Sequence, residues 1–525
     1  MRAPPAVHIR VHPVHPRLPS AHAFARIPVM SSLTNSLLTT LVHEPTPGQR
    51  KAIDALDRLL ATPKDRATLI LKGYAGTGKT TLVGALVKVL ANERRKVVLL
   101  APTGRAAKVL SAYAQAEAST IHRRIYSMGD DEDYGGGMSV KPNKDAGALF
   151  VVDEASMIGS GRGEGSFGDR DLLSDLFEHV FSARGCKLLL IGDPAQLPPV
   201  GSDHSPALVV KDLAEHGLIA GSIELTDVVR QAEDSGILVN ATALRHTLAE
   251  MLLDDGGPDE QRDVTLSKLA LSGAEGSKRI PTFDTSFPDV QRIEGLDLQD
   301  ALEEAYGRHG DDEVCLICRS NKRAYLYSQQ VRARIHGFDE ELMANDRLMV
   351  VKNNYFWAGE NGKKELIANG EQVLVKRMKG IEEKYGLRFA DLEVSWWNGT
   401  EEREMDVKVI VDVLAAEGPA LPGPRMKMLS QSVLANILAK SKGERFRLLK
   451  HDPYANALQV KYAYAVTCHK AQGGQWKSVF VDQGYVTEEM IDREYVRWLY
   501  TAITRASEKL YLLNFHPRFY GEGEE

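Results

Sequence analysis

The sequence predicts an α/β protein built on parallel sheets, and three observations carry that prediction. Apolar runs alternate with helical stretches, at residues 68–71, 96–101, 148–152 and 187–192. Runs that are apolar throughout and separated by helices are typical of parallel strands covered on both faces. One run leads directly into a glycine-rich loop followed by a helix, and another ends in two consecutive acidic residues.

Size and composition are those of an ordinary globular protein with several domains. The chain has 525 residues, which suggests three or four domains at roughly 150 residues each. Hydrophobic residues make up 43% and charged residues 26%, as in ordinary soluble globular proteins. No apolar run approaches the ~20 residues that a membrane span requires, so we expect no membrane partner, and we expect a cytoplasmic location. The net charge of −6 means that any nucleic-acid binding needs a local groove rather than a basic surface as a whole.

The first 43 residues differ from the rest in composition. They contain no Asp or Glu, and up to residue 27 they are rich in Pro, His and Arg. We expect a disordered N-terminal tail over residues 1–43, or an upstream start with Met30 as the natural beginning. An Arg-rich, acid-poor segment also suits an organellar transit peptide, which is the less favoured alternative.

The later part of the chain changes pattern twice. Residues 126–148 hold the acidic run 130–133 and three consecutive glycines, so they predict a protruding hairpin or loop. A second α/β region is expected from residue 313. Short strands from residue 371 to about 412 then suggest a small inserted β-barrel, followed by a helix over 426–439 and core strands at 479–482 and 510–514.

The four cysteines are sparse, as expected for a reducing compartment. Cys315 and Cys318 form a C-x-x-C pair within an apolar run. Positions three apart on a strand point to opposite faces, so we favour core packing over a zinc or redox site.

Residues 73–80, Gly-Tyr-Ala-Gly-Thr-Gly-Lys-Thr, match the phosphate-binding loop G-x-x-x-x-G-K-[ST] in full. Glycines let the backbone turn tightly, so that successive N–H groups and the next helix N-terminus face an anion. Lys79 supplies a charge for the β- and γ-phosphates, and the Thr80 hydroxyl is suited to Mg²⁺. We therefore predict that a nucleoside triphosphate contacts Gly73, Gly76, Thr77, Gly78, Lys79, Thr80 and Thr81.

Two further strands end in polar groups suited to the same ligand. The run 149–152 is followed by Asp153, which can hold Mg²⁺, and Glu154, which is placed to polarise a water as general base. The run 189–192 is followed by Asp193 and Gln196. Gln196 could sense the γ-phosphate by hydrogen bonding, and Asp193 could support the metal or the water.

Together these motifs resemble the superfamily 1 DNA helicases, specifically the RecD/Dda-like branch that typically moves 5′→3′. The resemblance runs from Gln49 to Arg505, most of the chain. It rests on the loop and carboxylates above and on six ordered segments: 101–108 (Ala-Pro-Thr-Gly-Arg-Ala-Ala-Lys), 119–122 (Ser-Thr-Ile-His), 228–231 (Val-Val-Arg-Gln), 369–371 (Asn-Gly-Glu), 464–473 (Tyr-Ala-Val-Thr-Cys-His-Lys-Ala-Gln-Gly) and 500–506 (Tyr-Thr-Ala-Ile-Thr-Arg-Ala).

The resemblance implies ATP and Mg²⁺ as ligands bound between two domains. Gln49 would read the adenine, Arg230 would reach the γ-phosphate, and Arg505 would act as an arginine finger. Gly473 belongs to the segment that couples DNA to nucleotide, so it joins the nucleotide-binding set. The catalytic set is then Lys79, Asp153, Glu154, Gln196, Arg230 and Arg505, with Thr80 and Asp153 on the metal.

The resemblance also implies contacts to a single strand through short polar side chains. Because phosphate contacts carry no sequence information, we expect sequence-independent binding. Tyr134 is the aromatic nearest the tip of the 126–148 segment and could wedge a fork, although the acidic run beside it would repel phosphate. The DNA-contacting set is Pro102, Thr103, Thr120, His122, Tyr134, Thr467 and His469, of which His122 and His469 could instead be structural.

The fold implied is two RecA-like parallel-sheet domains, with a pin-like hairpin inserted in the first and a small SH3-like β-barrel in the second. The expected segments are the tail (1–43), domain 1 (44–220), the start of domain 2 with a connector (221–312), domain 2 in two parts (313–370 and 461–525), and the inserted barrel with a helix (371–460).

The function predicted is that of an ATP-dependent DNA helicase or translocase acting 5′→3′ on single-stranded and forked duplex DNA. We expect a nucleoid-associated monomer in DNA repair or recombination, with single-strand-binding or repair proteins as partners. Two alternatives stay open. One is a DNA-stimulated ATPase or remodeller in a recombination-repair complex without robust unwinding. The other is a non-enzymatic clamp or loader that uses ATP only as a switch.

Overall fold

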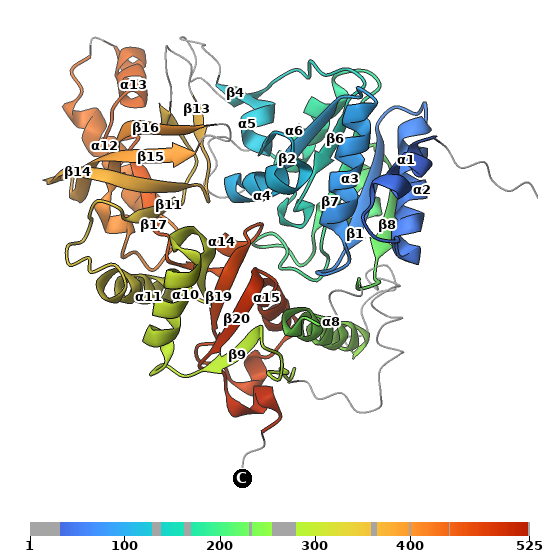
Figure 1. Ribbon diagram of the computed structural model, residues 1–525. Helices are drawn as coiled ribbons and strands as arrows, with labels where there is room; N and C mark the ends of the chain where they lie inside the picture. The colour runs from blue at the N-terminus through green and yellow to red at the C-terminus, as the bar shows by residue number, and fades with distance from the viewer. Residues whose placement is uncertain are drawn as a thin grey trace, which may run out of the picture.

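The computed structural model describes residues 32–128, 138–161, 170–229, 234–254, 280–358, 365–397, 401–439 and 441–522. Two α/β domains lie side by side, and a β-barrel with two helices sits at one end of the second domain (Figure 1). Among the helices described, none combines the length and the apolar character that crossing a membrane would require.

The first domain contains a six-stranded sheet in the order β3-β2-β6-β7-β1-β8, with every neighbouring pair parallel. The predicted apolar runs form four of its strands, because a strand that is apolar throughout can be buried on both faces of the sheet. The strands are β1 (Ala67–Gly73), β2 (Val97–Ala101), β3 (Ala118–Thr120), β6 (Leu149–Val152), β7 (Lys187–Gly192) and β8 (Ile219–Leu225).

Helices cover both faces of this sheet, as a doubly wound fold requires. One hydrophobic cluster joins the first four helices to one face, and a second cluster joins the others to the opposite face. The helices are α1 (Ser32–Thr40), α2 (Pro47–Ala61), α3 (Lys79–Asn92), α4 (Gly104–Ala114), α5 (Ile121–Ile125), α6 (Leu172–Phe181) and α7 (Val210–Glu215).

The expectation of a disordered tail over residues 1–43 is wrong at its C-terminal end. Residues 32–40 form α1, whose Leu33 and Leu37 are one helical turn apart and are 5% and 0% exposed. Both side chains join the core cluster beneath α2 and α3. The apolar spacing of these leucines outweighs the absence of acidic residues. Residues 1–31 lie outside the described part of the chain.

The second domain contains a five-stranded parallel sheet in the order β18-β10-β19-β20-β9. Its strands are β9 (Val290–Ile293), β10 (Val314–Cys318), β18 (Ala465–Thr467), β19 (Trp476–Asp482) and β20 (Ala506–Leu513). Its helices are α8 (Gly236–Asp254), α10 (Leu298–His309), α11 (Asn321–Arg334), α14 (Cys468–Ala471) and α15 (Arg493–Ile503).

Two of the expected boundaries differ from the structure. The limit at residue 220 falls inside β8, which pairs with β1 and so belongs to the first domain. The second sheet already includes β9, which lies in the segment 221–312 expected to hold the start of domain 2 and a connector, ahead of the α/β region expected from residue 313. Both strands carry polar residues within their runs, so a search for continuous apolar stretches does not find their full extent.

The inserted barrel is closed by five strands in the order β11-β14-β15-β16-β17. It begins at Arg347 rather than at residue 371, because β11 pairs with both β14 and β17. The strands are β11 (Arg347–Val350), β14 (Gln372–Lys384), β15 (Leu387–Trp397), β16 (Glu402–Ile410) and β17 (Leu458–Tyr462). Helices α12 (Gly423–Asn436) and α13 (Lys442–Lys450) follow β16, and leucines of both join a shared hydrophobic cluster with the barrel.

A buried ion pair fastens this barrel to the second domain. The Arg332 guanidinium on α11 donates from Nε to Asp346 Oδ1 at 2.7 Å and from Nη2 to Asp346 Oδ2 at 2.8 Å. Both side chains are almost completely buried, at 2% and 0% exposure. Paired, bidentate geometry of this kind fixes orientation, so the start of the barrel is held firmly on α11.

Two short antiparallel pairs complete the architecture. In the first domain β4 (Tyr126–Met128) pairs with β5 (Met138–Val140), and residues 129–137 between them lie outside the described part. In the second domain β12 (Asn354–Ala358) pairs with β13 (Glu365–Ile367). On β10, Cys315 and Cys318 are fully buried and belong to different hydrophobic clusters, which confirms that they pack into the core on opposite faces.

The two domains share a hydrophobic cluster. Tyr74, Ala195 and Leu197 come from loops of the first domain, and they belong to the same cluster as α8 and α15 of the second. Tyr74 is completely buried although it lies in the glycine-rich loop. The loops after β1 and β7 therefore face the second domain at the carboxyl edge of their sheet, where ligands of such sheets bind.

Candidate nucleotide site between the domains

The glycine-rich loop joins β1 to α3 as the sequence predicts. Gly76 and Gly78 have φ angles of 75° and 79°, in the left-handed region that favours glycine. A Cβ on Gly78 would lie 2.4 Å from Gln49 Nε2, so the loop leaves no room for a side chain there. Lys79 Nζ donates to the carbonyl oxygens of Gly73 and Tyr74, which holds the ammonium inside the loop.

The other loop residues divide into buried and exposed ones. Thr77 is 1% exposed, and its hydroxyl donates to Tyr74 O at 2.8 Å, so it braces the turn. Thr80 and Thr81 are exposed on the first turn of α3. The helix N-terminus, the ammonium and the Thr80 hydroxyl thus form a cradle suited to a triphosphate and its cation.

Gln49 is bonded to the loop in this structure. Its Oε1 accepts from Thr46 N at 3.1 Å, completing a capping box at the start of α2. Its Nε2 donates to Thr77 O at 3.0 Å. The side chain is 6% exposed. The hydrogen bonds of Gln49 show that it supports the phosphate loop. An adenine contact by Gln49 stays a prediction.

Asp153 and Glu154 follow β6, beside the loop. Asp153 Oδ1 accepts from the Glu154 backbone N–H at 2.9 Å, and Oδ2 accepts from the Tyr113 hydroxyl at 2.5 Å. Burial and the neighbouring Asp153 raise the pKa of Tyr113, so its hydroxyl remains a proton donor. Tyr113 on α4 was not predicted from the sequence, and it fixes the carboxylate expected to hold Mg²⁺.

Glu154 occupies a strained backbone conformation in the cleft. Its φ of 52° places a non-glycine residue in the left-handed region, a conformation that concentrates at functional sites. Burial raises the pKa of its carboxyl group, and Arg505 opposes that shift. Glu154 Oε1 lies 3.6 Å from Arg505 Nη1, with the two side chains 20% and 6% exposed.

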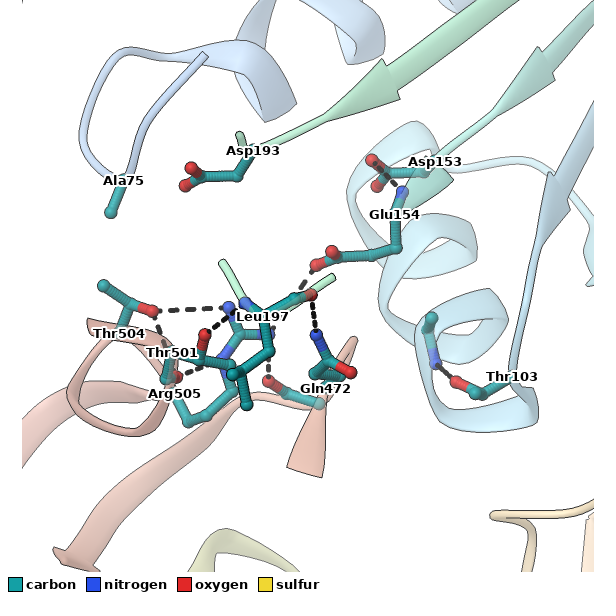
Figure 2. A network of polar contacts seen from close by, with 12 residues as sticks. Ala75, Thr103, Asp153, Glu154, Asp193, Leu197, Gln472, Thr501, Thr504 and Arg505 are labelled. Atoms are coloured by element: carbon teal, nitrogen blue, oxygen red, sulfur yellow. Dashed lines mark hydrogen bonds and ion pairs between the residues drawn. The ribbon is translucent and has the colours of Figure 1, made fainter. Parts of the chain in front are cut away.

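Arg505 is held between α15 and β20 by several acceptors. Its guanidinium donates to Thr501 O at 3.1 Å, to Gly474 O at 3.3 Å and to Thr504 Oγ1 at 3.4 Å. Figure 2 shows Arg505 with Thr501 and Thr504 on one side of the domain interface and Asp153 and Glu154 on the other. The structure therefore brings together an acid at the end of β6 and an arginine that follows it by hundreds of residues.

Gln196 lies on the loop that follows β7. It is 6% exposed, and its Oε1 has no hydrogen-bond partner among the described residues. Asp193, at the start of the same loop, is 2% exposed and accepts from Ala195 N at 2.9 Å. A buried amide with a spare acceptor is unusual unless a further group completes it. A buried amide with a free acceptor is the arrangement expected of a residue that forms a hydrogen bond only when a ligand is bound.

The second domain holds this loop by bonds that sequence reasoning missed. Leu197 N donates to Thr501 Oγ1 at 2.9 Å, and Leu197 O accepts from Gln472 Nε2 at 2.7 Å (Figure 2). The Tyr500 hydroxyl also reaches the first domain. Thr501, Gln472 and Tyr500 all fall within the motif-like segments 464–473 and 500–506. Their polar side chains, in segments that also hold Arg505 or precede it, were the sequence signal that could have identified them.

Two predicted residues lie outside the described part of the chain. Arg230 follows Val229, whose backbone N–H donates to Gly76 O at 3.0 Å. Tyr134 lies between β4 and β5. Their roles stay predictions.

The threonines predicted to bind DNA share a structural position at helix N-termini. Thr103 caps α4 and Thr120 caps α5, each accepting a backbone N–H with its hydroxyl. Thr467 stands at the N-cap of α14 without such a bond. Thr120 is 3% exposed, so its hydroxyl serves the helix. Pro102 is half-buried between β2 and α4, and burial lowers the pKa of His122 to about 4, which leaves its ring neutral at neutral pH.

His469 and Lys470 are adjacent on α14 but have different surroundings. His469 lines a cavity of about 800 Å³ together with the acidic residues Asp203, Glu250, Glu488, Glu489, Asp492 and Glu494. Arg493 and Arg497 also line this cavity, but the carboxylates outnumber them, and a net negative lining disfavours a nucleic-acid backbone. Lys470 Nζ instead donates to Asn369 Oδ1 at 2.5 Å. The next residue, Gly370, lies against Thr103 of the first domain. Lys470 is therefore better placed than His469 to meet a strand at Thr103.

Gly473 packs against the first domain rather than the phosphate loop. Its φ is 71°, and a Cβ there would lie 2.7 Å from Ala106 Cβ on α4 and 3.4 Å from Thr103 Oγ1. The close approach requires glycine. A nucleotide contact at Gly473 stays a prediction, and contact with α4 is what the structure shows.

A second contact between the domains lies at the barrel. Glu371 Oε1 is 3.6 Å from Arg123 Nη2 on α5, and Glu371 Oε2 accepts from Trp396 Nε1 at 2.8 Å. Arg123 also donates to Leu366 O at 3.2 Å. The predicted Asn-Gly-Glu segment thus ties the barrel to the first domain.

Comparisons with known proteins match both halves of the site. Residues 44–256 match a family model described as an AAA domain, and residues 462–513 match a UvrD-like helicase C-terminal domain. The ATP-dependent RecD2 DNA helicase of Deinococcus radiodurans is 33% identical over 178 residues, 34% of this chain and 22% of that protein. The ATP-dependent DNA helicase dda of Enterobacteria phage T4 is 23% identical over 380 residues, 70% of this chain and 77% of that protein.

A solved structure also resembles the chain. The Pif1 helicase from Bacteroides in complex with ADP-AlF3 and ssDNA matches with a TM-score of 0.42 and 15% identity, covering 90% of this chain and 93% of that one. The match to RecD2 spans only about a fifth of that relative's length, 22%. The nucleotide site divided between two parallel-sheet domains, the two matched family models and the similarity to RecD2 and Dda together support a superfamily 1 helicase of the RecD/Dda-like type.

Proposed function

We propose that this protein is an ATP-dependent DNA helicase that moves 5′→3′ along a single strand and separates the duplex ahead of it. The observation that carries the proposal is the contact of Arg505 with Glu154 across the cleft. An arginine finger and a general base that come from different domains can act together only when the domains are close. Hydrolysis is then linked to domain closure, which is what a motor needs.

The residues fit ATP and Mg²⁺. Lys79 and the N-terminus of α3 would hold the β- and γ-phosphates, with Arg230 and Arg505 on the γ-phosphate side. Thr80 and Asp153 would hold Mg²⁺, which neutralises charge on the phosphate oxygens. No cluster of three or more His, Cys, Asp or Glu suited to a metal occurs in the described ranges. Mg²⁺ commonly takes one or two protein ligands beside phosphates and water, which Thr80 and Asp153 would supply.

Three residues of the chain would carry out ATP hydrolysis, each with a distinct role. Glu154 would accept the proton of the attacking water, and its raised pKa brings its basicity nearer to neutral pH. Gln196, with its spare Oε1, would hold the water or the γ-phosphate. Arg505 would offset the charge that develops on the transferred group.

The DNA partner is proposed to be single-stranded and forked DNA, bound by a monomer. The strand would pass Thr103, Thr467 and Lys470, next to the barrel. We take the barrel to be SH3-like. The β4–β5 pair would be the base of a strand-separating pin. We place the protein in the cytoplasm at the nucleoid, in repair or recombination, beside single-strand-binding or repair proteins.

The experiment that tests this function compares unwinding of duplexes that carry a 5′ or a 3′ single-stranded tail. We expect strand release with the 5′ tail, ATP and Mg²⁺, and little with the 3′ tail. Lys79→Ala should abolish hydrolysis and unwinding while strand binding is largely kept. Unwinding by Lys79→Ala would overturn the proposal, and release from the 3′ tail alone would overturn the polarity.

A second candidate function is a DNA-stimulated translocase or remodeller without robust unwinding. The acidic run at residues 130–133 favours it, because carboxylates on a pin would repel phosphate. A forked duplex with a fluorescent label separates the two functions. Strand release by the protein at low concentration excludes the remodeller, while ATP hydrolysis without release supports it.

Single-strand binding should weaken at alkaline pH through Lys470. Burial lowers the pKa of its ammonium to about 8, from an ordinary value of 10.5. The charge is therefore present at pH 7 and mostly lost at pH 9, where loss of one ion pair with a phosphate should weaken binding about fivefold. Fluorescence anisotropy with a labelled single strand measures it. Lys470→Gln should remove most of the dependence, whereas Lys477→Gln, at an exposed position of the central strand β19, should keep it.

A further inference from the structure

Tyr500 makes an unusual pair of contacts for a residue on the buried face of a helix. It lies on α15 of the second domain and is completely buried. Its hydroxyl donates to Asp193 Oδ2 at 2.6 Å and accepts from the Ala75 backbone N–H at 2.9 Å. One hydroxyl group therefore joins the helix that leads to Arg505 to two loops of the first domain, the phosphate loop and the loop that carries Gln196.

The protonation of Tyr500 is fixed by its surroundings. Burial, and next the charge of Asp193, raise its pKa well above the ordinary value, while the hydrogen bond from the Ala75 N–H, and to a smaller extent Arg245, oppose the shift. Arg245 itself is 2% exposed and lies over the Tyr74 ring at 4.2 Å. The hydroxyl therefore keeps its proton across the working pH range, and it can donate and accept at the same time.

The loop that carries Gln196 is held at both ends by the second domain. Tyr500 holds Asp193 at the start of the loop. Thr501 Oγ1 and Gln472 Nε2 hold the backbone N–H and carbonyl of Leu197 at its end. Between these points Gln196 has little freedom of its own, so the position of its amide follows the position of α15.

We propose that Tyr500 is a positioning residue that makes the loop of Gln196 and the phosphate loop move with the second domain. The inference rests on the proposed function and deepens it, because it names the link by which strand binding reaches the nucleotide. Gln472 follows α14 directly, and α14 begins after Thr467 and carries Lys470. A displacement of α14 by a bound strand is passed through Gln472 and α15 to Leu197, Asp193 and Ala75.

Tyr500→Phe tests this role with a matched control. Phenylalanine keeps the ring and removes only the hydroxyl. Tyr495→Phe is the control, because Tyr495 lies on the same helix, is 3% exposed and accepts from Gln483 Nε2 at 3.0 Å. Each variant loses a hydroxyl that makes a buried hydrogen bond, but among the described residues only the Tyr500 hydroxyl bonds to the first domain. ATP hydrolysis is measured with and without single-stranded DNA over a range of ATP concentrations.

The expected result is a loss in kcat that Tyr495→Phe does not share. In Tyr500→Phe the DNA-stimulated kcat should fall about tenfold or more, as for a buried hydrogen bond lost in the productive state. Its KM for ATP should stay within about twofold, because the Lys79 cradle is intact. Equal DNA-stimulated kcat in Tyr500→Phe and wild type would overturn the inference. A wild type that hydrolyses no ATP would instead overturn the proposed function.

Hydrogen exchange gives a readout that does not depend on activity. In Tyr500→Phe the amide of Ala75 should exchange faster than in wild type, and in Tyr495→Phe it should not. Unchanged exchange at Ala75 would also overturn the inference.

If Tyr500→Phe fails to fold, the Thr501 pair tests the same link. Thr501→Val removes the acceptor for Leu197 N–H, and Thr501→Ser keeps it. The valine variant should lose DNA stimulation and the serine variant should retain it. Equal stimulation in both would contradict the coupling.

Discussion

Replacing Glu154 with glutamine is expected to lower the DNA-stimulated kcat of ATP hydrolysis about 1,000-fold, within the range that a general base contributes. Glutamine has the size and shape of glutamate and cannot accept the proton of the attacking water. The residue touches no part of the Lys79 cradle in the described hydrogen bonds. ATP should therefore still bind, so that KM changes little while kcat falls.

The measurement is steady-state ATP hydrolysis with saturating single-stranded DNA, accompanied by nucleotide binding. Glu178→Gln is the matched control, because Glu178 is exposed on α6, away from the cleft. It should behave as wild type. A Glu154→Gln protein that kept more than a tenth of the wild-type kcat would show that another group takes the proton.

Arg505→Lys should lower kcat by about 1,000-fold or more, since an arginine finger is worth 10³–10⁵ in rate. Lysine keeps the charge but lacks the planar fork of donors. Arg505 uses that fork to contact Thr501, Gly474 and Thr504 while facing Glu154. A single ammonium cannot hold this arrangement, so the positive charge is no longer fixed where it is needed.

Arg292→Lys provides the matched control for this exchange. Arg292 lies on β9 of the same domain and pairs with the exposed Glu522 at 3.0 Å. Loss of such a surface ion pair changes the stability of the fold little, so the rate of ATP hydrolysis should match that of wild type. Single-strand binding by Arg505→Lys should also persist. Near-normal hydrolysis in Arg505→Lys would remove the arginine from the catalytic set and with it the main support for a split site.

The strands that could be predicted are those whose sequence is apolar throughout. Core strands such as β6 and β7 are buried along their whole length, so their composition alone identifies them. β11 was missed because it is four residues long and acquires its role only by pairing with β14 and β17, the latter more than a hundred residues later. Its membership in the barrel is a property of the tertiary fold, which local patterns do not record.

The candidate site divides in the same way. Lys79, Asp153 and Glu154 follow strands in fixed order, so the sequence places them at one edge of the sheet. Tyr113 and Tyr500 act through hydroxyls whose partners are 40 and 307 residues away. A tyrosine in a helix resembles any core aromatic in sequence, and only the folded chain shows that its hydroxyl meets a carboxylate.

The second contact between the domains, Arg123 with Glu371, has a mechanical consequence. Arg123 lies on α5, which directly follows β3 at the edge of the first sheet, whereas Leu197 follows β7, with β2 and β6 between those two strands. Three strand spacings amount to about 14 Å. Two bodies that touch at points this far apart do not move past each other freely. A shift of 1 Å at Leu197 about a fixed Arg123 is a rotation of about 4° over this span. The contact at the barrel therefore restrains the second domain to small rotations relative to the first.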